Sequence, residues 1–202
     1  IEITGGSYQG VSHGVTTVVQ LLDGTGGEVR VHKAHIEDKP ESRFRALLWD
    51  IARQPHTLDG IKQVISYCRY YKINYLQLHL TDNEAITFPF ASVTGLTASN
   101  TRGIRVFTKA EWLDLVEFAD RRGVTLVPEI EMPGHAGTLV RARPDLFKTG
   151  TYHHATLNIA NPAAVAALKS MLTEICEVFQ STPYIHIGAD EADLSLLHYG
   201  KG

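Results

Sequence analysis

The organisation of the chain is clearest in residues 74–83, which read NYLQLHLTDN. The apolar and β-favouring residues of this stretch predict a strand over residues 74–80, and three polar residues follow it. An amphipathic helix is predicted just before, because Thr57 has the chemistry of an N-cap and residues 58–71 carry apolar side chains at helical spacing. The unit is therefore a helix that leads into a strand with a polar end.

The same unit recurs along the chain. Apolar runs predict further strands over residues 46–49, 124–130 and 184–187. Helical patterns lie between the strands, and two of these helices have clear start signals, a capping box at Thr108 and Glu111 and the pair Asn161-Pro162. The strand ends carry polar or charged pairs, which are Asp50/Arg53, His79/Asp82, Glu131/His135 and Asp190/Glu191.

Strands that alternate with helices predict an α/β fold with a parallel sheet. An open doubly wound sheet and a (β/α)8 barrel of the TIM type both have this pattern. Polar groups at several strand ends favour the barrel, whose active site lies at the carboxyl ends of its strands. The first strand is not followed by a Gly-x-Gly-x-x-Gly motif, which disfavours a dinucleotide-binding sheet. We count four strands, so we expect only about the first four βα units of a barrel.

The composition limits the possible partners. Of the 202 residues, 44% are apolar and 20% are charged, and the net charge of −3 gives no reason to expect binding to nucleic acid. No apolar run approaches the roughly 20 residues that span a membrane. Cys68 and Cys176 fall on apolar helix faces, so we expect both to be free core thiols. The pair His153-His154 is expected to be a solvated part of a loop.

Two of the strand ends carry residue types suited to acid–base chemistry. Asp190 and Glu191 are adjacent carboxyl groups, and like charges held together raise one pKa and keep an acid protonated. The alternative is that they cap the next helix. Glu131 and His135 flank a Pro-Gly turn and could form a charged pair, or the histidine could simply be satisfied within the turn.

Metal-assisted hydrolysis is a further possibility. His79 and Asp82 have a spacing that also suits a pair of metal ligands, and the other strand ends could add nitrogen and oxygen ligands. No His-x-His or Glu-x-x-His motif accompanies them. We therefore expect no metal site.

Taken in order, the strand ends resemble the catalytic domain of family-20 β-N-acetylhexosaminidases over about residues 43–193. Matching motifs run along the whole of this stretch rather than at one site. They are the Arg-(x)4-Asp-x-x-Arg pattern of residues 45–53, Lys-x-Asn and His-x-x-Asp at residues 72–82, Pro-Glu-x-Glu-x-Pro-Gly-His at residues 128–135, and His-x-Gly-Ala-Asp-Glu at residues 186–191.

The chain departs from the family pattern at four positions. Ala46 and Ala189 replace glycines, which adds a methyl group to the backbone at each place. Glu131 replaces an aspartate and lengthens the side chain by one methylene, and Asn83 replaces a second aspartate. None of these changes removes a group that the chemistry must have.

The resemblance implies hydrolysis of terminal, non-reducing β-linked N-acetylhexosamine with retention of configuration and without a cofactor. The substrate's own acetamido oxygen would attack the anomeric carbon and form an oxazolinium intermediate. Glu191 would be the general acid and base, and Asp190 would orient the acetamido group. Arg45 would hold sugar hydroxyl groups. His79, Asp82, Glu131 and His135 would form a polar network that supports the acid.

The resemblance also implies a domain organisation. Residues 1–41 would be the end of a small α+β domain with its linker, and residues 42–202 the first half of the barrel. The other half, or a second copy of the chain in a homodimer, would then be needed to complete the site. A catalytically incomplete fragment or sugar-binding remnant remains the alternative. Members of the family are expected to be secreted, periplasmic or lysosomal.

Overall fold

The structure is a computed structural model, and it describes residues 1–149 and 155–193. His153-His154 therefore lies outside the described residues. The elements follow one another as α1 (Tyr8–Gln20), β1 (Leu22–Asp23), β2 (Arg30–Val31), β3 (Ala46–Asp50), α2 (Leu58–Tyr70), β4 (Tyr75–His79), α3 (Lys109–Asp120), β5 (Thr125–Glu129), α4 (Gly137–Ala142), α5 (Pro144–Phe147) and α6 (Pro162–Val178).

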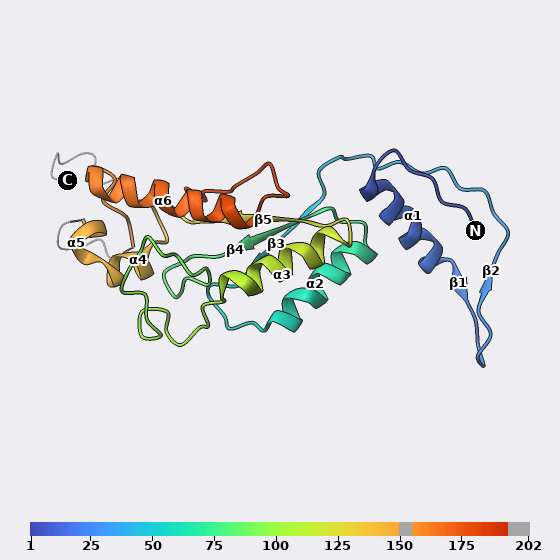
Figure 1. Ribbon diagram of the computed structural model, residues 1–202, viewed down its shortest axis with the longest axis horizontal. Helices are drawn as coiled ribbons and strands as arrows, with labels where there is room; N and C mark the ends of the chain where they lie inside the picture. The colour runs from blue at the N-terminus through green and yellow to red at the C-terminus, as the bar shows by residue number, and fades with distance from the viewer. Residues whose placement is uncertain (150–154, 194–202) are drawn as a thin grey trace.

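A parallel sheet in the order β3-β4-β5 lies at the centre of the molecule (Figure 1). The predicted α/β fold with a parallel sheet is confirmed. The register pairs Asp50 with His79 and His79 with Glu129, so the last residues of the three strands form one row. Residues paired in this way point to the same face of a sheet. The polar strand ends are thus brought together by backbone pairing alone.

The segment after α6 lies beside β5 but is not a full strand. A strand was predicted over residues 184–187, whereas the structure has a single parallel bridge between Glu129 and His186. Backbone hydrogen bonds from Ile130 to His186 and from Met132 to Ile187 continue the pairing on one side. The prediction of a regular fourth strand is therefore wrong for the described chain, although its place beside β5 is right.

The helix start signals were predicted correctly. The Thr57 hydroxyl accepts a hydrogen bond from the Gly60 amide at the start of α2. Thr108 and Glu111 form the reciprocal capping box of α3. Asn161 caps α6 by accepting from the Ala163 amide.

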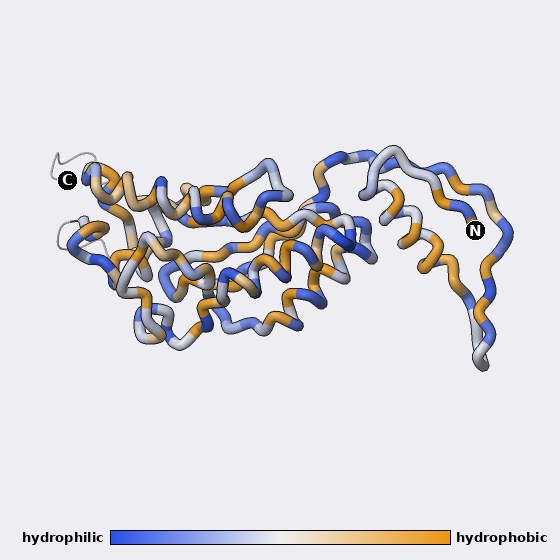
Figure 2. The backbone as a smooth tube through the Cα atoms, in the orientation of Figure 1, coloured by the Kyte–Doolittle hydropathy of each residue, from blue (hydrophilic) through white to orange (hydrophobic). Residues whose placement is uncertain are grey.

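The core lies between the sheet and the helices α2, α3 and α6. Apolar residues run along the strands and recur along these helices (Figure 2). Trp112 is fully buried and packs against Phe88, Phe107 and Phe179. Cys68 is buried in this core as predicted, but Cys176 is exposed. The prediction was wrong for Cys176 because the buried face of α6 passes through Ile175 and Val178 instead.

Residues 1–41 attach to the end of the sheet where the strands begin. Side chains of α1 donate to backbone carbonyls that follow α3, with Tyr8 Oη bonded to Arg121 at 2.7 Å and Ser12 Oγ bonded to Arg122 at 2.8 Å. β1 and β2 form an antiparallel pair that extends away from the sheet (Figure 1). This part of the chain therefore lies opposite the polar strand ends.

One face of the sheet is left open by the described residues. Leu48 of β3 is 54% exposed, and Phe44 and Tyr184 near the strand starts are also about half exposed. No helix in the described part of the chain is both long and apolar enough to cross a membrane. The row that ends in Asp50, His79 and Glu129 lies at the edge of this open face.

Replacing Trp112 by alanine should lower the free energy of unfolding by about 3–5 kcal/mol, because it removes a fully buried ring and leaves a cavity. Urea denaturation followed by far-UV circular dichroism measures the change. Leu113→Ala is the matched control on the same helix, since Leu113 is 45% exposed and its truncation should change stability by about 0.5 kcal/mol or less. Equal losses in the two variants would contradict this account of the core.

Candidate active site

The row at the strand ends is the inner part of a polar cluster. His79 donates from Nε2 to Asp82 at 2.7 Å, and its Nδ1 lies 3.4 Å from a Glu129 oxygen. Glu129 is also held by Gln77 Nε2 at 3.0 Å and by His186 Nδ1 at 2.9 Å. Asp82, His79 and Glu129 are all buried. A buried charge must be paired, and here each carboxylate has a donor.

The charges of this inner part shift its pKa values. Burial alone would lower the pKa of His79, but its hydrogen bonds to Asp82 and Glu129 and the negative charges nearby raise it to about 10. Burial opposes ionisation of Asp82, yet hydrogen bonds from His79 and the Asn83 amide, with the charge of Arg53, hold the pKa of Asp82 below its usual range. His79 is therefore an imidazolium at neutral pH.

Arg53 closes the cluster on the side of β3. Its guanidinium reaches Asp50 at 2.8 Å and Asp82 at 2.6 Å, and it lies 3.4 Å from His135 Nδ1. Asp50 also accepts hydrogen bonds from the Ala52 and Arg53 amides, which fixes the turn after β3. The Arg53 side chain is 44% exposed, so part of its guanidinium faces the open side of the cluster.

His135 connects the buried carboxylate to the exposed pair. Its Nδ1 lies 3.5 Å from Asp82 Oδ1, and its Nε2 lies 3.1 Å from Glu191 Oε2 and 3.7 Å from Asp190 Oδ2. Asp190 and Glu191 are largely exposed. An imidazole with one carboxylate at each nitrogen can relay or stabilise a proton between them. Asp82, His135 and Glu191 lie in this order, while His135 Nδ1 accepts a hydrogen bond from Arg53 and Nε2 is buried without a hydrogen-bond partner among the described residues.

The turn that carries the exposed pair is tightly packed. Gly188, Ala189 and Glu191 have positive φ values of 65°, 75° and 45°. A Cβ atom on Gly188 would lie 1.7 Å from Glu131 Oε2, and one on Gly134 would lie 2.6 Å from the Asp190 carbonyl oxygen. Ala189 occupies a conformation that favours glycine, at the position where the family motif has one.

Two groups of described residues bring ligand atoms within 4.8 Å of one another, as a metal ion would require. One is the buried set of His79, Glu129 and Glu131, and the other is His135 with Asp190 and Glu191. In the first set, hydrogen bonds from Gln77 and His79 already occupy Glu129, and a neutral histidine is needed as a ligand. A metal at this set would have to displace the proton that Asp82 and Glu129 stabilise on His79.

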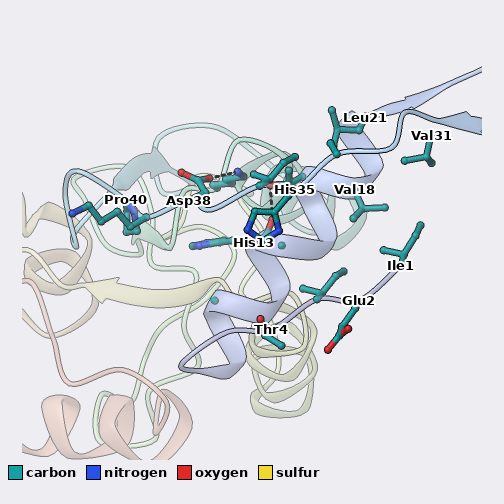
Figure 3. A pocket seen from close by; sticks show the side chains of 18 of the residues that line it. Ile1, Glu2, Thr4, His13, Val18, Leu21, Val31, His35, Asp38 and Pro40 are labelled. Carbon is teal, nitrogen blue, oxygen red and sulfur yellow. Dashed lines mark hydrogen bonds and ion pairs between the residues drawn. The ribbon is translucent and has the colours of Figure 1, made fainter.

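Arg45 does not lie at this cluster, so the expectation that it holds substrate is corrected. It precedes β3, and the five-residue rise of the strand separates its backbone from that of Asp50 by about 16 Å. Its guanidinium donates to the carbonyls of Lys72 and Ser42. It lines a separate cavity of about 960 Å³ between α1 and residues 31–40, shown in Figure 3. Arg45 therefore stabilises the start of the sheet.

The structure brings the other expected residues together, which are His79, Asp82, Glu131, His135, Asp190 and Glu191. Sequence reasoning noted Arg53 and Glu129 in the motifs but gave neither a role in the site. The signal for Glu129 was periodicity. Gln77 and His79 are two residues apart and face the same side of β4, and Glu129 is paired with His79 in the register. Arg53 follows β3 and had no such signal.

Fold and cluster together define an α/β protein with a carboxylate-rich site at the carboxyl ends of its parallel strands. Residues 43–197 match the model of the catalytic domain of glycosyl hydrolase family 20. The chain belongs to this family.

Relatives of known sequence agree. The chain is 30% identical to a β-hexosaminidase of Vibrio furnissii, over 95% of this chain and 36% of that protein. It is also 30% identical to a β-hexosaminidase of Akkermansia muciniphila, over 96% of this chain and 44% of that protein. The chain thus spans less than half the length of these relatives.

Solved structures give the same result. The crystal structure of a β-N-acetylhexosaminidase from Bacteroides fragilis superposes with a TM-score of 0.83 at 27% identity, over 91% of this chain and 39% of that one. A family-20 exo-β-N-acetylglucosaminidase from Vibrio harveyi, in complex with N-acetylglucosamine, superposes with a TM-score of 0.80 at 27% identity, over 93% and 34% of the two chains.

The ring of His79 should be doubly protonated at pH 8, because Asp82 and Glu129 raise its pKa to about 10. Nitrogen-detected NMR of the imidazole measures the state directly. Since this pKa is higher in the folded than in the unfolded chain, the stabilisation is complete below pH 6.5 and is lost as pH rises through 10. Asp82→Asn should lower the pKa of His79. A neutral His79 at pH 8 in the unsubstituted protein would refute this assignment of charge.

Proposed function

We propose that the chain carries the catalytic pair of a β-N-acetylhexosaminidase, which removes terminal, non-reducing β-linked N-acetylglucosamine or N-acetylgalactosamine from glycans. The observation that carries this proposal is His135, which lies between the buried Asp82 and the exposed Glu191. A proton donor backed by an imidazole and a second carboxylate can give up a proton and take one back. The names of the family relatives support the substrate class.

The proposed reaction has two steps and retains the anomeric configuration. In the first, Glu191 gives its proton to the glycosidic oxygen while the acetamido oxygen of the substrate bonds to the anomeric carbon, and the aglycone alcohol leaves. In the second, Glu191 takes a proton from water, and the water oxygen bonds to the anomeric carbon and opens the oxazolinium ring. Asp190 accepts a hydrogen bond from the acetamido N–H and stabilises the positive charge that develops there.

Arg53 is the cation that the site offers to the sugar. It lies beside His135, is partly exposed, and is oriented by Asp50 and Asp82. A guanidinium fixed by two carboxylates keeps donors free for hydroxyl groups. This gives Arg53 the hydroxyl-binding role that the sequence suggested for Arg45.

The sheet β3-β4-β5, with residues 184–187 beside it, is proposed to be the first four units of a (β/α)8 barrel. Exposure of the open face at Leu48 and Tyr184 supports this, because a barrel buries that face. More strands, from further chain or from a second copy of this one, would cover it. The same exposure favours the second candidate, a catalytically incomplete fragment that binds N-acetylhexosamine weakly. The two candidates differ in whether water is excluded from Asp190 and Glu191, as it would be in the covered barrel and not in the incomplete fragment.

Glu191→Gln should lower the hydrolysis of an unactivated β-N-acetylglucosaminide by about 10²–10⁴-fold, because it removes the proton donor. Rates are measured on the 202-residue chain with and without EDTA, and the anomer released first is identified by NMR. Loss of activity in the variant, insensitivity to EDTA and release of the β-anomer are expected. An active Glu191→Gln variant would overturn the role of Glu191. An inactive unsubstituted chain would favour the incomplete fragment.

Arg53→Gln should lower kcat/KM by about 10- to 100-fold, the loss expected when a hydrogen bond from a charged group is removed. Arg45→Gln is the matched control. Within the described residues, the hydrogen bonds of the Arg45 side chain go only to backbone carbonyls near the start of β3. It should lower the melting temperature and change kcat/KM by no more than about threefold. The reverse order of the two effects would return the sugar-binding role to Arg45.

A further inference from the structure

Glu131 ends in a buried carboxyl group that the proposed reaction does not use. Its Oε1 lies 3.6 Å from His79 Nδ1, and oxygens of Glu129 and Glu131 lie within 4.8 Å of each other beside this imidazole. Its Oε2 is buried without a hydrogen-bond partner among the described residues. Two carboxyl groups held this close in a buried site do not both ionise, because each negative charge disfavours the other. The pair Glu129–Glu131 therefore holds one shared proton.

The proton belongs on Glu131. Glu129 has two donors at its oxygens, because Gln77 Nε2 lies at 3.0 Å and His79 Nδ1 at 3.4 Å. These donors favour the ionised form of Glu129 and lower its pKa. Glu131 has the opposite surroundings.

Burial, the hydrogen bond with Glu129 and the negative charges of Glu129 and Asp190 raise the pKa of Glu131 to about 8, against the opposing charge of His79. The charged groups that face it come from three elements. His79 is on β4, Glu129 is on β5, and Asp190 is on the turn after residue 187. Asp82 pairs with His79, and Arg53 pairs with Asp82. An ionised Glu131 would add a third buried carboxylate around one imidazolium.

The same carboxyl group packs on the turn that carries the catalytic pair. A Cβ atom on Gly188 would lie 1.7 Å from Oε2, 2.1 Å from Cδ and 2.3 Å from Oε1 of Glu131, so the whole carboxyl group rests against the Gly188 backbone. Asp190 and Glu191 follow within three residues. An aspartate at position 131 would be one methylene shorter and would leave this contact open.

We propose that Glu131 is a positioning residue, whose carboxyl group is kept neutral by the proton shared with Glu129 and supports Gly188 so that Asp190 and Glu191 face His135. This inference rests on the proposed function for the roles of Asp190 and Glu191. Ionisation of Glu131 would place a second negative charge beside that of Glu129 and repel Asp190. The turn would then lose its support as the pH rises.

The proton is tested by stability, without reference to activity. The unfolding equilibria of the full chain and of Glu131→Gln are measured in urea from pH 5 to pH 9. The folded pKa of Glu131 lies above its unfolded value, so its stabilisation is complete below pH 4.5 and is lost as pH rises through 8. The free energies of unfolding of the two proteins should be alike at pH 5. Above pH 5, the unfolding constant of the unsubstituted chain should rise by up to tenfold per pH unit relative to that of the variant.

Glu129→Gln is the matched control, because Glu129 lies two residues before Glu131 in the same cluster. Glu129 has a lowered pKa, so its substitution should destabilise the protein at every pH above about 4.3. Parallel stability curves for the unsubstituted chain and Glu131→Gln would overturn the shared proton. Such a result would leave the proposed hydrolytic activity untouched.

The contact with Gly188 is tested by a double-mutant cycle. Gly188→Ala should destabilise the chain strongly when Glu131 is present and much less in the Glu131→Ala background, where the clash is removed. Gly103→Ala is the control, because Gly103 also has a positive φ of 77° but has nothing within 4 Å of its Cβ position. Equal effects of Gly188→Ala in both backgrounds would overturn the support.

Positioning is read from the pH–rate profile on an aryl β-N-acetylglucosaminide. Glu131→Gln should move the alkaline limb of the profile to higher pH, whereas Glu131→Asp should lower kcat more than it changes KM. An unmoved alkaline limb in Glu131→Gln would overturn the positioning role. If the unsubstituted chain has no turnover, the proposed activity fails for this chain, and the stability series and the cycle still decide the proton and the contact.

Discussion

The register of the parallel sheet is the constraint on which the candidate site depends. Pairing of Asp50 with His79, of His79 with Glu129 and of Glu129 with His186 places four polar side chains in one row. A shift of one residue in any pair would turn one of these side chains to the opposite face. The apolar residues that alternate with them, such as Leu76 and Leu78, pack against the helices and fix the register. The hydrophobic core therefore determines the geometry of the polar cluster.

Charge balance is the second constraint, and it follows from the first. The row brings carboxylates into a buried region, and a buried anion is tolerated only when it is paired. His79 stays protonated because its hydrogen bonds to Asp82 and Glu129 raise its pKa, and Arg53 adds a second positive charge beside Asp82. With these two cations the cluster balances two buried carboxylates, Asp82 and Glu129. Glu131 exceeds this balance, which is the physical reason that it holds a proton.

Much of this arrangement could be predicted from the sequence, because its signals are local. N-caps and the capping box depend on a few neighbouring residues, and they were predicted correctly for α2, α3 and α6. Arg45 and Arg53 show where local reasoning stops. Both belong to one motif, but the strand between them separates them by its full length, and only the observed bounds of β3 decide which one reaches the site.

Other features depended on contacts between distant segments. Cys176 could not be oriented from the apolar pattern of α6, since that helix is apolar over more than one face and packing selects the buried one. Residues 184–187 have the composition of a strand, but the extent of their pairing depends on their contact with β5, where the structure has a single bridge. The contact of Glu131 with Gly188 joins residues that are 57 positions apart, and no periodicity reports such a contact.

Burial separates the site into two layers that respond differently to change. His79, Asp82, Glu129 and Glu131 lie below the surface and set the charge of the cluster, whereas Asp190 and Glu191 lie above it and face the solvent. His135 belongs to both layers, because one of its ring nitrogens faces Asp82 and the other faces Glu191. Substitutions in the lower layer should therefore act through protonation and through the shape of the turn. Substitutions in the upper layer remove groups that face the substrate. The turn after residue 187 links the two effects, because its backbone rests on Glu131 while its side chains reach the surface.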